Sequence, residues 1–244
     1  MTLPPFHWWR TVFFLIPAVS LYTIACGIVS LLSTLVDRSG HFAHRCARLW
    51  AWLILKTTGV KVERSGAALP PLTESSVFVA NHASFYDIPI LFTAVPHQLR
   101  IPAKAALGRV PFIGWHLYLA GHLLIDRSNA GPGVFKRMQR MIRQNASLIV
   151  FPEGSRSRDG QIGRFKGGSF LLAIESQLPI VPVTIINSVS VMKKDELMVS
   201  PARVRVVVHE AIPTLGLTRQ HARDLAKQVQ QVVASGLGDG KGRI

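Results

Sequence analysis

The sequence predicts an α/β fold with a mixed or mostly parallel sheet flanked by helices, and an N-terminal membrane-associated helical segment. Two observations support this. From Gly59 onward, short runs rich in β-branched residues alternate with helical segments, which is typical of α/β domains. Before it, the 26 residues from Thr11 to Val36 carry no charge. At 244 residues, the chain can form one such domain with a sizeable core and an appendage.

The N-terminal apolar run is long enough to cross a membrane. As a helix rising about 1.5 Å per residue it would reach roughly 39 Å, beyond the roughly 30 Å hydrocarbon core. A secretory signal has a shorter apolar region and a small-residue cleavage site, and this run ends in LVDRSG instead. Trp8, Trp9 and Arg10 flank the run as membrane-interface residues do. Pro17 and Gly27 leave a re-entrant hairpin open beside a full span, and a buried soluble helix is the third alternative.

The next stretch, from His41 to Thr58, is predicted to form an amphipathic helix. One apolar stripe with helical spacing consists of Phe42, Cys46, Leu49, Trp50 and Leu53, and basic residues on its flank are His41, Arg45, Arg48 and Lys56. This pattern is typical of a helix lying in a membrane interface. The alternative is a soluble helix that packs its stripe on the domain. Either way, residues 1–58 are predicted to be a membrane anchor.

Residues 59–236 are predicted to form the α/β domain, and residues 237–244 a flexible tail. The expected strands are Val60–Glu63, Ser76–Ala80, Leu99–Ala103, His122–Ile125, Ser147–Phe151, Ile180–Ile186 and Arg203–His209. The expected helices are Ile88–Ala94, Gly108–Leu119, Gly133–Gln144, Gly168–Glu175 and Thr218–Ser235, the last with Thr218 as its N-cap.

Composition narrows the class of partner. The net charge is +15, only 17% of residues are charged and 48% are apolar, so the chain is neither disordered nor typical of a soluble domain. Twelve basic and three acidic residues lie between Leu99 and Lys166. This excess favours an anionic membrane or a phosphorylated substrate, and no nucleic-acid module is recognisable. Cys26 and Cys46 make neither a disulfide scaffold nor a zinc motif, and no metal is expected.

The most informative segment is Asn81–Asp87, which directly follows the strand SSVFVA. His82 at a strand end and Asp87 at a helix start, five residues later, are placed to form a dyad. The carboxylate would then fix the tautomer of the imidazole and leave its other nitrogen free as a general base. The alternative reading is a loop histidine beside an aspartate that caps the helix.

Three further segments complete a pattern: GHLLIDR from Gly121, FPEGSRS from Phe151 and VPV within Ile180–Ile186. In order and spacing, the four segments resemble the motif blocks NHxxxxD, GxxxIDR, FPEGxRS and VPV of the glycerolipid acyltransferase family. The resemblance is strongest to lysophosphatidic acid acyltransferases and covers roughly Val77 to Ile186. Departures are Ala105 and Ala106 after the lysine of the AK segment, and Ser155 in the third block.

The resemblance implies a role for each matching residue. His82 would deprotonate the sn-2 hydroxyl of a lysophospholipid, which attacks an acyl thioester directly, and Asp87 would orient His82. No acyl-enzyme is implied, so Ser84 would not be a nucleophile. The positions implied to bind the glycerol phosphate are Arg127, Glu153, Gly154 and Arg156, with Glu153 able to hold an arginine in place; Lys104 adds positive charge to the same pocket.

The resulting functional hypothesis is a membrane-associated acyltransferase that converts lysophosphatidic acid to phosphatidic acid, using acyl-CoA or acyl carrier protein as co-substrate and no cofactor. Anionic membrane lipids are expected as further partners, and nucleic acid is not. Alternatives are an acyltransferase for a lyso-ornithine lipid or lysophosphatidylglycerol, an acyl thioesterase, and a basic protein that only binds anionic lipid. The basic residues after the apolar run favour a catalytic domain on the cytoplasmic side. Because no organelle signal is recognisable, a bacterial inner membrane is expected rather than an endoplasmic reticulum.

Overall fold

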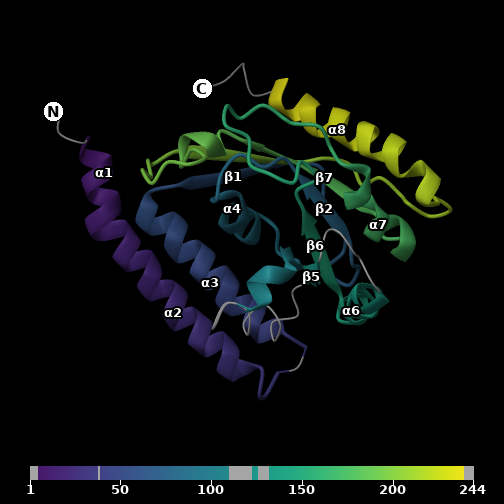
Figure 1. The fold of residues 1–244 in the computed structure, drawn as a ribbon, viewed down its shortest axis with the longest axis horizontal. Helices are drawn as coiled ribbons and strands as arrows, with labels where there is room; N and C mark the ends of the chain where they lie inside the picture. The colour runs from purple at the N-terminus through teal and green to yellow at the C-terminus, as the bar shows by residue number, and fades with distance from the viewer. Residues whose placement is uncertain (1–4, 38, 110–122, 126–131, 239–244) are drawn as a thin grey trace.

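A six-stranded sheet flanked by helices forms the centre of the computed structural model, which describes residues 5–37, 39–109, 123–125 and 132–238 (Figure 1). The strand order is β1-β8-β7-β2-β6-β3. The strands are β1 (Lys61–Gly66), β2 (Val77–Ala80), β3 (Gln98–Arg100), β6 (Ala146–Val150), β7 (Ile180–Ile186) and β8 (Arg203–Val208). Two short strands, β4 (Pro102–Lys104) and β5 (Leu123–Ile125), pair separately in parallel. The expected α/β class is confirmed.

The sheet is mostly parallel. Only β7 and β8 pair in antiparallel fashion, while the other neighbours are parallel. Strand β2 lies between β6 and β7, with Val77 opposite both Leu148 and Ile180. The carboxyl ends of β2, β6 and β7 therefore leave the sheet at one common edge.

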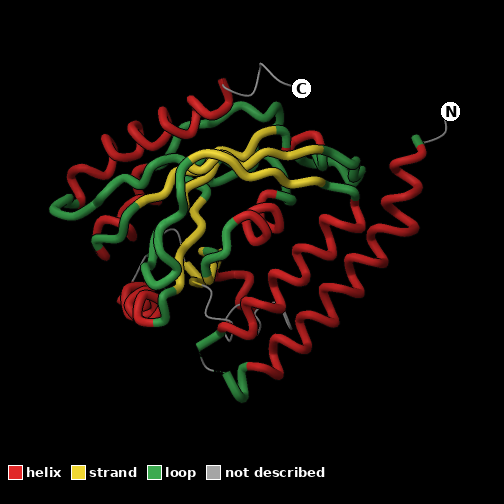
Figure 2. The backbone as a smooth tube through the Cα atoms, turned by 180° about the vertical axis from the view of Figure 1, so that it is seen from behind, coloured by secondary structure: helices red, strands yellow, loops and turns green. Residues whose placement is uncertain are grey.

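Helices cover both faces of the sheet, as Figure 2 shows from behind. They are α1 (Phe6–Arg10), α2 (Ile16–Ser33), α3 (His41–Thr58), α4 (Asp87–Ala94), α6 (Pro132–Arg143), α7 (Leu171–Ser176) and α8 (Ala222–Gly238). Alternate residues of β2 point to opposite faces: Phe78 packs with α3 and α4, and Val79 packs with α6, α7 and α8. Both faces of the strand are buried, which explains its continuous apolar run.

The N-terminal apolar run forms one helix of 28 residues, Phe6–Ser33, which is long and apolar enough to cross a membrane by length and composition. The helix continues through Pro17 and Gly27, so the chain does not turn back within the run as the hairpin alternative required. A π-helical turn over Thr11–Leu15 comes just before Pro17. Such a wide turn is a common way for a helix to accommodate the missing N–H and the bulk of a proline.

Helix α3 spans His41–Thr58 as predicted and runs back along α2 (Figure 1). The indole N–H of Trp50 donates to Thr23 Oγ1 at 3.0 Å and joins the two helices. One side of α3 enters the core through Ala51, Ile54 and Leu55. Another side leaves three large apolar side chains exposed, namely Phe42, Leu49 and Trp52. The helix thus packs on the domain and presents an apolar surface at the same time.

Several predicted helices differ in their ends. In the segment expected as a helix over Gly168–Glu175, the residues Gly167–Phe170 form a 3-10 helix, and α7 begins only at Leu171. Thr218 is the predicted N-cap and forms a capping box with His221, but the first turn is 3-10 and α8 continues to Gly238, into the segment predicted as a tail. Most of the helix expected at Gly108–Leu119 lies outside the described residues.

His44 is a buried histidine on the core side of α3, 5.5 Å from the ring of Phe92. Burial, together with the nearby guanidinium groups of Arg100 and Arg48, lowers the pKa of His44 from its ordinary 6.5 to about 3. The folded protein therefore keeps this ring neutral at pH values where the unfolded chain takes up a proton.

This difference predicts a pH dependence of stability. The contribution of neutral His44 is complete above pH 6.5 and is lost as the pH falls from 6.5 toward 3, because only the unfolded chain gains a proton there. Between pH 7 and pH 5, the wild type should lose about 2 kcal/mol more unfolding free energy than His44→Gln. Chemical denaturation in detergent measures this. His41→Gln, at an exposed histidine of the same helix, is the control and should follow the wild type; parallel curves for all three proteins would contradict the prediction.

Candidate active site

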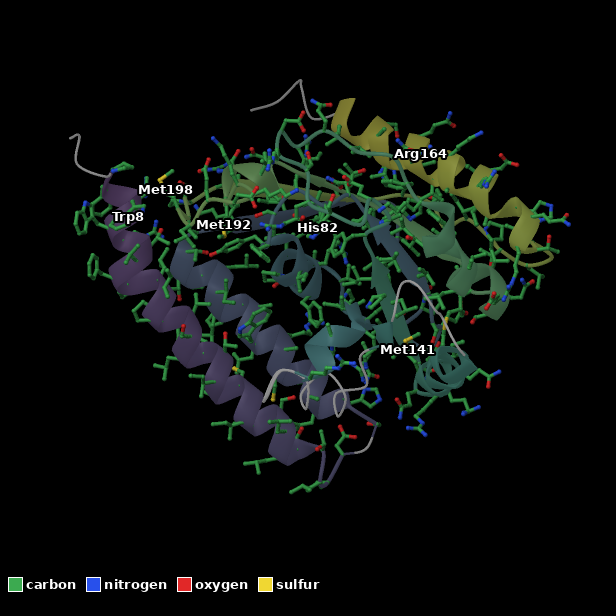
Figure 3. The ribbon with its side chains drawn as sticks, viewed as in Figure 1. Trp8, His82, Met141, Arg164, Met192 and Met198 are labelled. Atoms are coloured by element: carbon green, nitrogen blue, oxygen red, sulfur yellow. The ribbon has the colours of Figure 1, made fainter. Side chains whose placement is uncertain are left out.

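The candidate site lies at the carboxyl edge of the sheet, where β2 and β6 end. His82 comes two residues after β2, and Glu153 comes three residues after β6. Because the two strands are parallel neighbours, their following segments meet at the same place. Figure 3 shows His82 near the middle of the molecule, beside the sheet.

His82 and Asp87 form the predicted dyad. The Nδ1 atom of His82 lies 2.7 Å from Oδ2 of Asp87, and the aspartate is fully buried. The His82 side chain is 18% exposed, and its Nε2 makes no hydrogen bond to a described residue. The ring stacks on Phe151, with ring centroids 4.2 Å apart and an interplanar angle of 21°. The imidazole is thus fixed at one nitrogen and on one face, while the other nitrogen remains available to a substrate.

Asp87 is held in place by the backbone. Its Oδ2 also accepts hydrogen bonds from the amides of Ala83 at 2.8 Å and Ser84 at 2.9 Å. Asp87 is the first residue of α4, where the helix dipole favours a negative charge. The same carboxylate oxygen therefore closes the loop that carries His82 and receives its Nδ1–H. The hydroxyl of Ser84 donates to the carbonyl oxygen of Met192 and makes no hydrogen bond to His82, which agrees with the expectation that Ser84 is not a nucleophile.

Glu153 binds backbone amides. Its Oε1 accepts from the N–H of His82 at 2.9 Å, and its Oε2 accepts from the N–H of Gly163 at 3.2 Å. The sequence suggested an arginine as the partner of this carboxylate, whereas the structure gives both oxygens to the main chain. The N–H of Ser157 in turn donates to the carbonyl oxygen of His82 at 2.8 Å. The FPEGSRS segment therefore fixes His82 at both of its backbone polar groups.

Burial affects the ionisation of Glu153. Its side chain is largely inaccessible, and burial raises the pKa of its carboxyl above the ordinary value, against the opposing effect of the hydrogen bonds from His82 and Gly163. The two amide donors stabilise the carboxylate in this apolar setting.

Gly154 and Arg156 follow within the same turn. Gly154 has a φ of +77°, a conformation that favours glycine, and its N–H donates to Phe151 at 3.2 Å to close the turn. The guanidinium carbon of Arg156 lies 3.6 Å from the ring centroid of Phe85. Arg156 Nη1 is buried and has no hydrogen-bond partner among the described residues. This donor is therefore available to an anionic group of a substrate.

Two predicted residues are only partly placed or not placed. Lys104 is the last residue of β4 and pairs in register with Ile125, the last residue of β5. Arg127, two residues beyond Ile125, lies outside the described residues, so its predicted role stays a prediction. Among the described residues, no group of three or more His, Cys, Asp or Glu side chains gathers as metal ligands would.

Asn81 is a positioning residue that the sequence analysis did not single out. Its Nδ2 donates to the carbonyl oxygen of Ile185 at 2.9 Å, and its Oδ1 accepts from the N–H of Ile185 at 2.7 Å. This pair of bonds ties the end of β2 to β7 directly beside His82. Its place before the histidine was the only signal in the sequence. The stacking partners Phe151 and Phe85 gave no signal of their roles.

The fold and this site define a class of protein. The family model described as acyltransferase matches residues 59–186, and the chain belongs to the acyltransferase family. A solved structure with the same fold is that of the 1-acyl-sn-glycerophosphate acyltransferase PlsC from Thermotoga maritima, with a TM-score of 0.81 at 22% identity over 98% of this chain and 99% of that one.

Curated relatives carry a more particular name. A 1-acyl-sn-glycerol-3-phosphate acyltransferase of Chlamydomonas reinhardtii is 33% identical over 172 residues, which cover 69% of this chain and 50% of the relative. The alpha form of the enzyme from Mus musculus is 32% identical over 194 residues, covering 75% of this chain and 68% of the relative. The chain spans about half the length of the first of these curated relatives.

Asn81→Ala should destabilise the protein by roughly 2–4 kcal/mol, because the N–H and carbonyl of Ile185 would remain buried without partners. Asn81→Asp keeps the acceptor for the N–H of Ile185 but sets a carboxylate oxygen against the carbonyl oxygen of Ile185. It should therefore not restore the stability of the wild type. Chemical denaturation in detergent measures the loss, with the exposed Gln161→Ala as the matched amide control. Equal denaturation midpoints for Asn81→Ala and the control would refute this role.

Proposed function

We propose that the protein transfers a fatty acyl group from an acyl thioester, acyl-CoA or acyl carrier protein, to the sn-2 hydroxyl of lysophosphatidic acid, forming phosphatidic acid. The observation that carries the proposal is the 2.7 Å contact between His82 Nδ1 and buried Asp87, with Nε2 of a partly exposed ring left unbonded by described residues. The family supports acyl transfer, and the names of the relatives support this acceptor.

The mechanism follows from the protonation of one imidazole. Nε2 of His82 takes the proton of the acceptor hydroxyl as its oxygen attacks the thioester carbonyl. Asp87 keeps the proton on Nδ1 and stabilises the imidazolium that forms. When the tetrahedral intermediate collapses, the carbon–sulfur bond breaks and the imidazolium returns its proton to the leaving thiolate. The products are the ester and a free thiol, and no acyl-enzyme is required.

A cavity lies next to the segment that carries the dyad, through Ala83. Its volume is about 460 Å³, and its described lining includes Ala83, Gln161 and Asn187 but neither residue of the dyad nor Arg156. Arg156, held over Phe85, offers its unpartnered donor to the phosphate of the acceptor. We assign Lys104 and Arg127 to the same phosphate, on the family resemblance.

We also propose that the protein is membrane-associated. The helix Phe6–Ser33 would measure about 42 Å, enough for the hydrocarbon core, and only 6% of its most apolar window is buried inside the protein. Exposed aromatic and aliphatic side chains on α3 continue this apolar surface. Residues 1–58 would anchor the domain of residues 59–236 at a bacterial inner membrane, on its cytoplasmic side, so that the acyl tail of the acceptor stays in lipid.

The first test removes the base. His82→Ala should reduce kcat about 10²–10⁴-fold with lysophosphatidic acid and acyl-CoA, because His82 is the base that accepts the hydroxyl proton. Asp87→Asn should fall in the same range, since the imidazole loses its fixed tautomer. Thiol release and phosphatidic acid are both followed in detergent, with Gln228→Ala, at an exposed position of α8, as control. Thiol release without lipid product in the wild type would point to a thioesterase, and full activity of His82→Ala would overturn the mechanism.

The second test concerns the acceptor. Arg156→Gln should raise KM for lysophosphatidic acid roughly tenfold while kcat changes less, because one charged hydrogen bond to phosphate is lost. Arg158→Gln is the matched control, because Arg158 is exposed and forms a salt bridge at the surface, to Asp195. Arg156→Gln should not change KM for a lyso-lipid without a phosphate, such as a lyso-ornithine lipid. An unchanged KM for lysophosphatidic acid would contradict the assignment and favour another acceptor.

A further inference from the structure

A second cavity, of about 400 Å³, lies on the other side of the molecule from the dyad. One wall is the first half of α3, and the opposite wall is the turn from Pro96 to Gln98 that leads into β3. Asn145, directly before β6, also lines it. The cavity therefore opens at the amino ends of β3 and β6, whereas His82 and Glu153 follow the carboxyl ends of β2 and β6. The length of β6, about 3.3 Å per residue over five residues, separates the two places by roughly 15 Å.

The cavity is basic. Three side chains from successive turns of α3 line it, His41, Arg45 and Arg48, and its described lining contains no carboxylate. In the part of the chain that the structure describes, neither arginine forms an ion pair. Arg48 Nη1 donates to the carbonyl oxygen of Pro96 at 3.2 Å, which holds this guanidinium across the cavity between its two walls. Two uncompensated guanidinium groups in one concave site are a strong attraction for an anion.

Two buried histidines line the same space. His44 and His97, 7% and 1% exposed, line the cavity, and each ring lies against backbone carbonyl groups, His44 against His97 and His97 against Pro70 and Pro71. The side-chain oxygen of Gln98 is buried without a partner among the described residues, but as an acceptor it does not bind an anion. Burial lowers the pKa of both histidines, so each ring is neutral and carries one N–H donor.

The wall of the cavity is built firmly. The side-chain N–H of Gln98 donates to the carbonyl oxygen of Ser39 at 3.0 Å, and joins β3 to the segment just before α3. Asp37, the nearest acidic residue on this segment, accepts the N–H groups of Ser39 and Phe42 and so caps α3. Its carboxylate is thus occupied at the start of the helix. The two walls are tied together without help from a ligand.

The position of the cavity on α3 indicates where its ligand comes from. Leu49 follows Arg45 by four residues and Trp52 follows Arg48 by four, so each exposed apolar side chain lies one turn from an arginine of the cavity. A lipid whose tails lie along Leu49 and Trp52 would bring its head group to the arginines. A soluble anion has no apolar group that could pack on Leu49 and Trp52.

We propose that this cavity binds the phosphate of an anionic phospholipid head group, at a site separate from the active site. The proposal rests on the membrane association proposed above and is independent of the acyl transfer. Arg45 and Arg48 supply both the positive charge and the N–H donors to the phosphate oxygens. The anionic lipid of the surrounding bilayer then fixes α3, and with it the domain, at a defined depth and orientation.

The test is equilibrium binding of a short-chain lipid to the full chain in detergent micelles. Dioctanoyl phosphatidylglycerol is the probe, because it is anionic and its sn-2 position is already acylated. We expect the double variant Arg45→Gln/Arg48→Gln to bind at least about tenfold more weakly than the wild type, because two charged hydrogen bonds are lost. The control Arg64→Gln/Arg223→Gln removes the same charge from exposed positions elsewhere and should bind as the wild type does.

Three further measurements separate the alternatives. Arg156→Gln should keep the affinity, and a loss there instead would place the lipid in the active site and overturn the proposal. Dioctanoyl phosphatidylcholine should bind more weakly than phosphatidylglycerol, and equal binding would overturn an anion site. Inorganic phosphate should compete only weakly; competition as strong as that of the lipid would assign the cavity to a soluble anion. Arg45→Gln alone, at an exposed position, keeps the test valid if the double variant unfolds.

Discussion

The parallel pairing of β2 with β6 is the constraint on which the rest of the site depends. It places the segment that carries His82 beside the segment that carries Glu153, although 71 residues separate them in sequence. A parallel pair needs a long crossover, and here the crossover contains β3, β4, β5 and α6. Without this pairing, neither backbone group of His82 would have its present partner.

Two buried carboxylates hold the site together, and both do so through backbone amides. Asp87 accepts two amides in addition to the imidazole, and Glu153 accepts one amide from each of two loops. Buried charge is tolerated because N–H donors meet both oxygens of Glu153 and Oδ2 of Asp87, whereas Oδ1 of Asp87 is buried without a partner among the described residues. The first carboxylate fixes the ring of the base, and the second fixes its main chain. The base is therefore set in position by the protein before any substrate arrives.

Much of this could be predicted from the sequence, where the signal is local. The apolar runs located β2, β6 and β7, the helical stripe located α3 to the residue, and the five-residue spacing located the dyad. The partners of Glu153 and Asn81 could not be predicted, because they are backbone groups of segments chosen by the tertiary fold. The basic flank of α3 could also be predicted from the sequence, but the cavity that it lines could not. Its second wall comes from Pro96–Gln98, about fifty residues later in the chain.

The division of α3 between two environments has a practical consequence for anyone who wants a water-soluble version of the enzyme. Deleting residues 1–58 would remove the exposed helix, but also Ile54 and Leu55, which cover one face of the sheet together with α4. Each such side chain contributes about 1.5–3 kcal/mol when fully buried. Truncation would thus replace the exposed apolar surface of the N-terminal helices with a newly exposed apolar face of the sheet. A water-soluble version would instead keep α3 and replace its outward residues, such as Leu49 and Trp52, together with the exposed apolar residues of α2, such as Leu21 and Ile24.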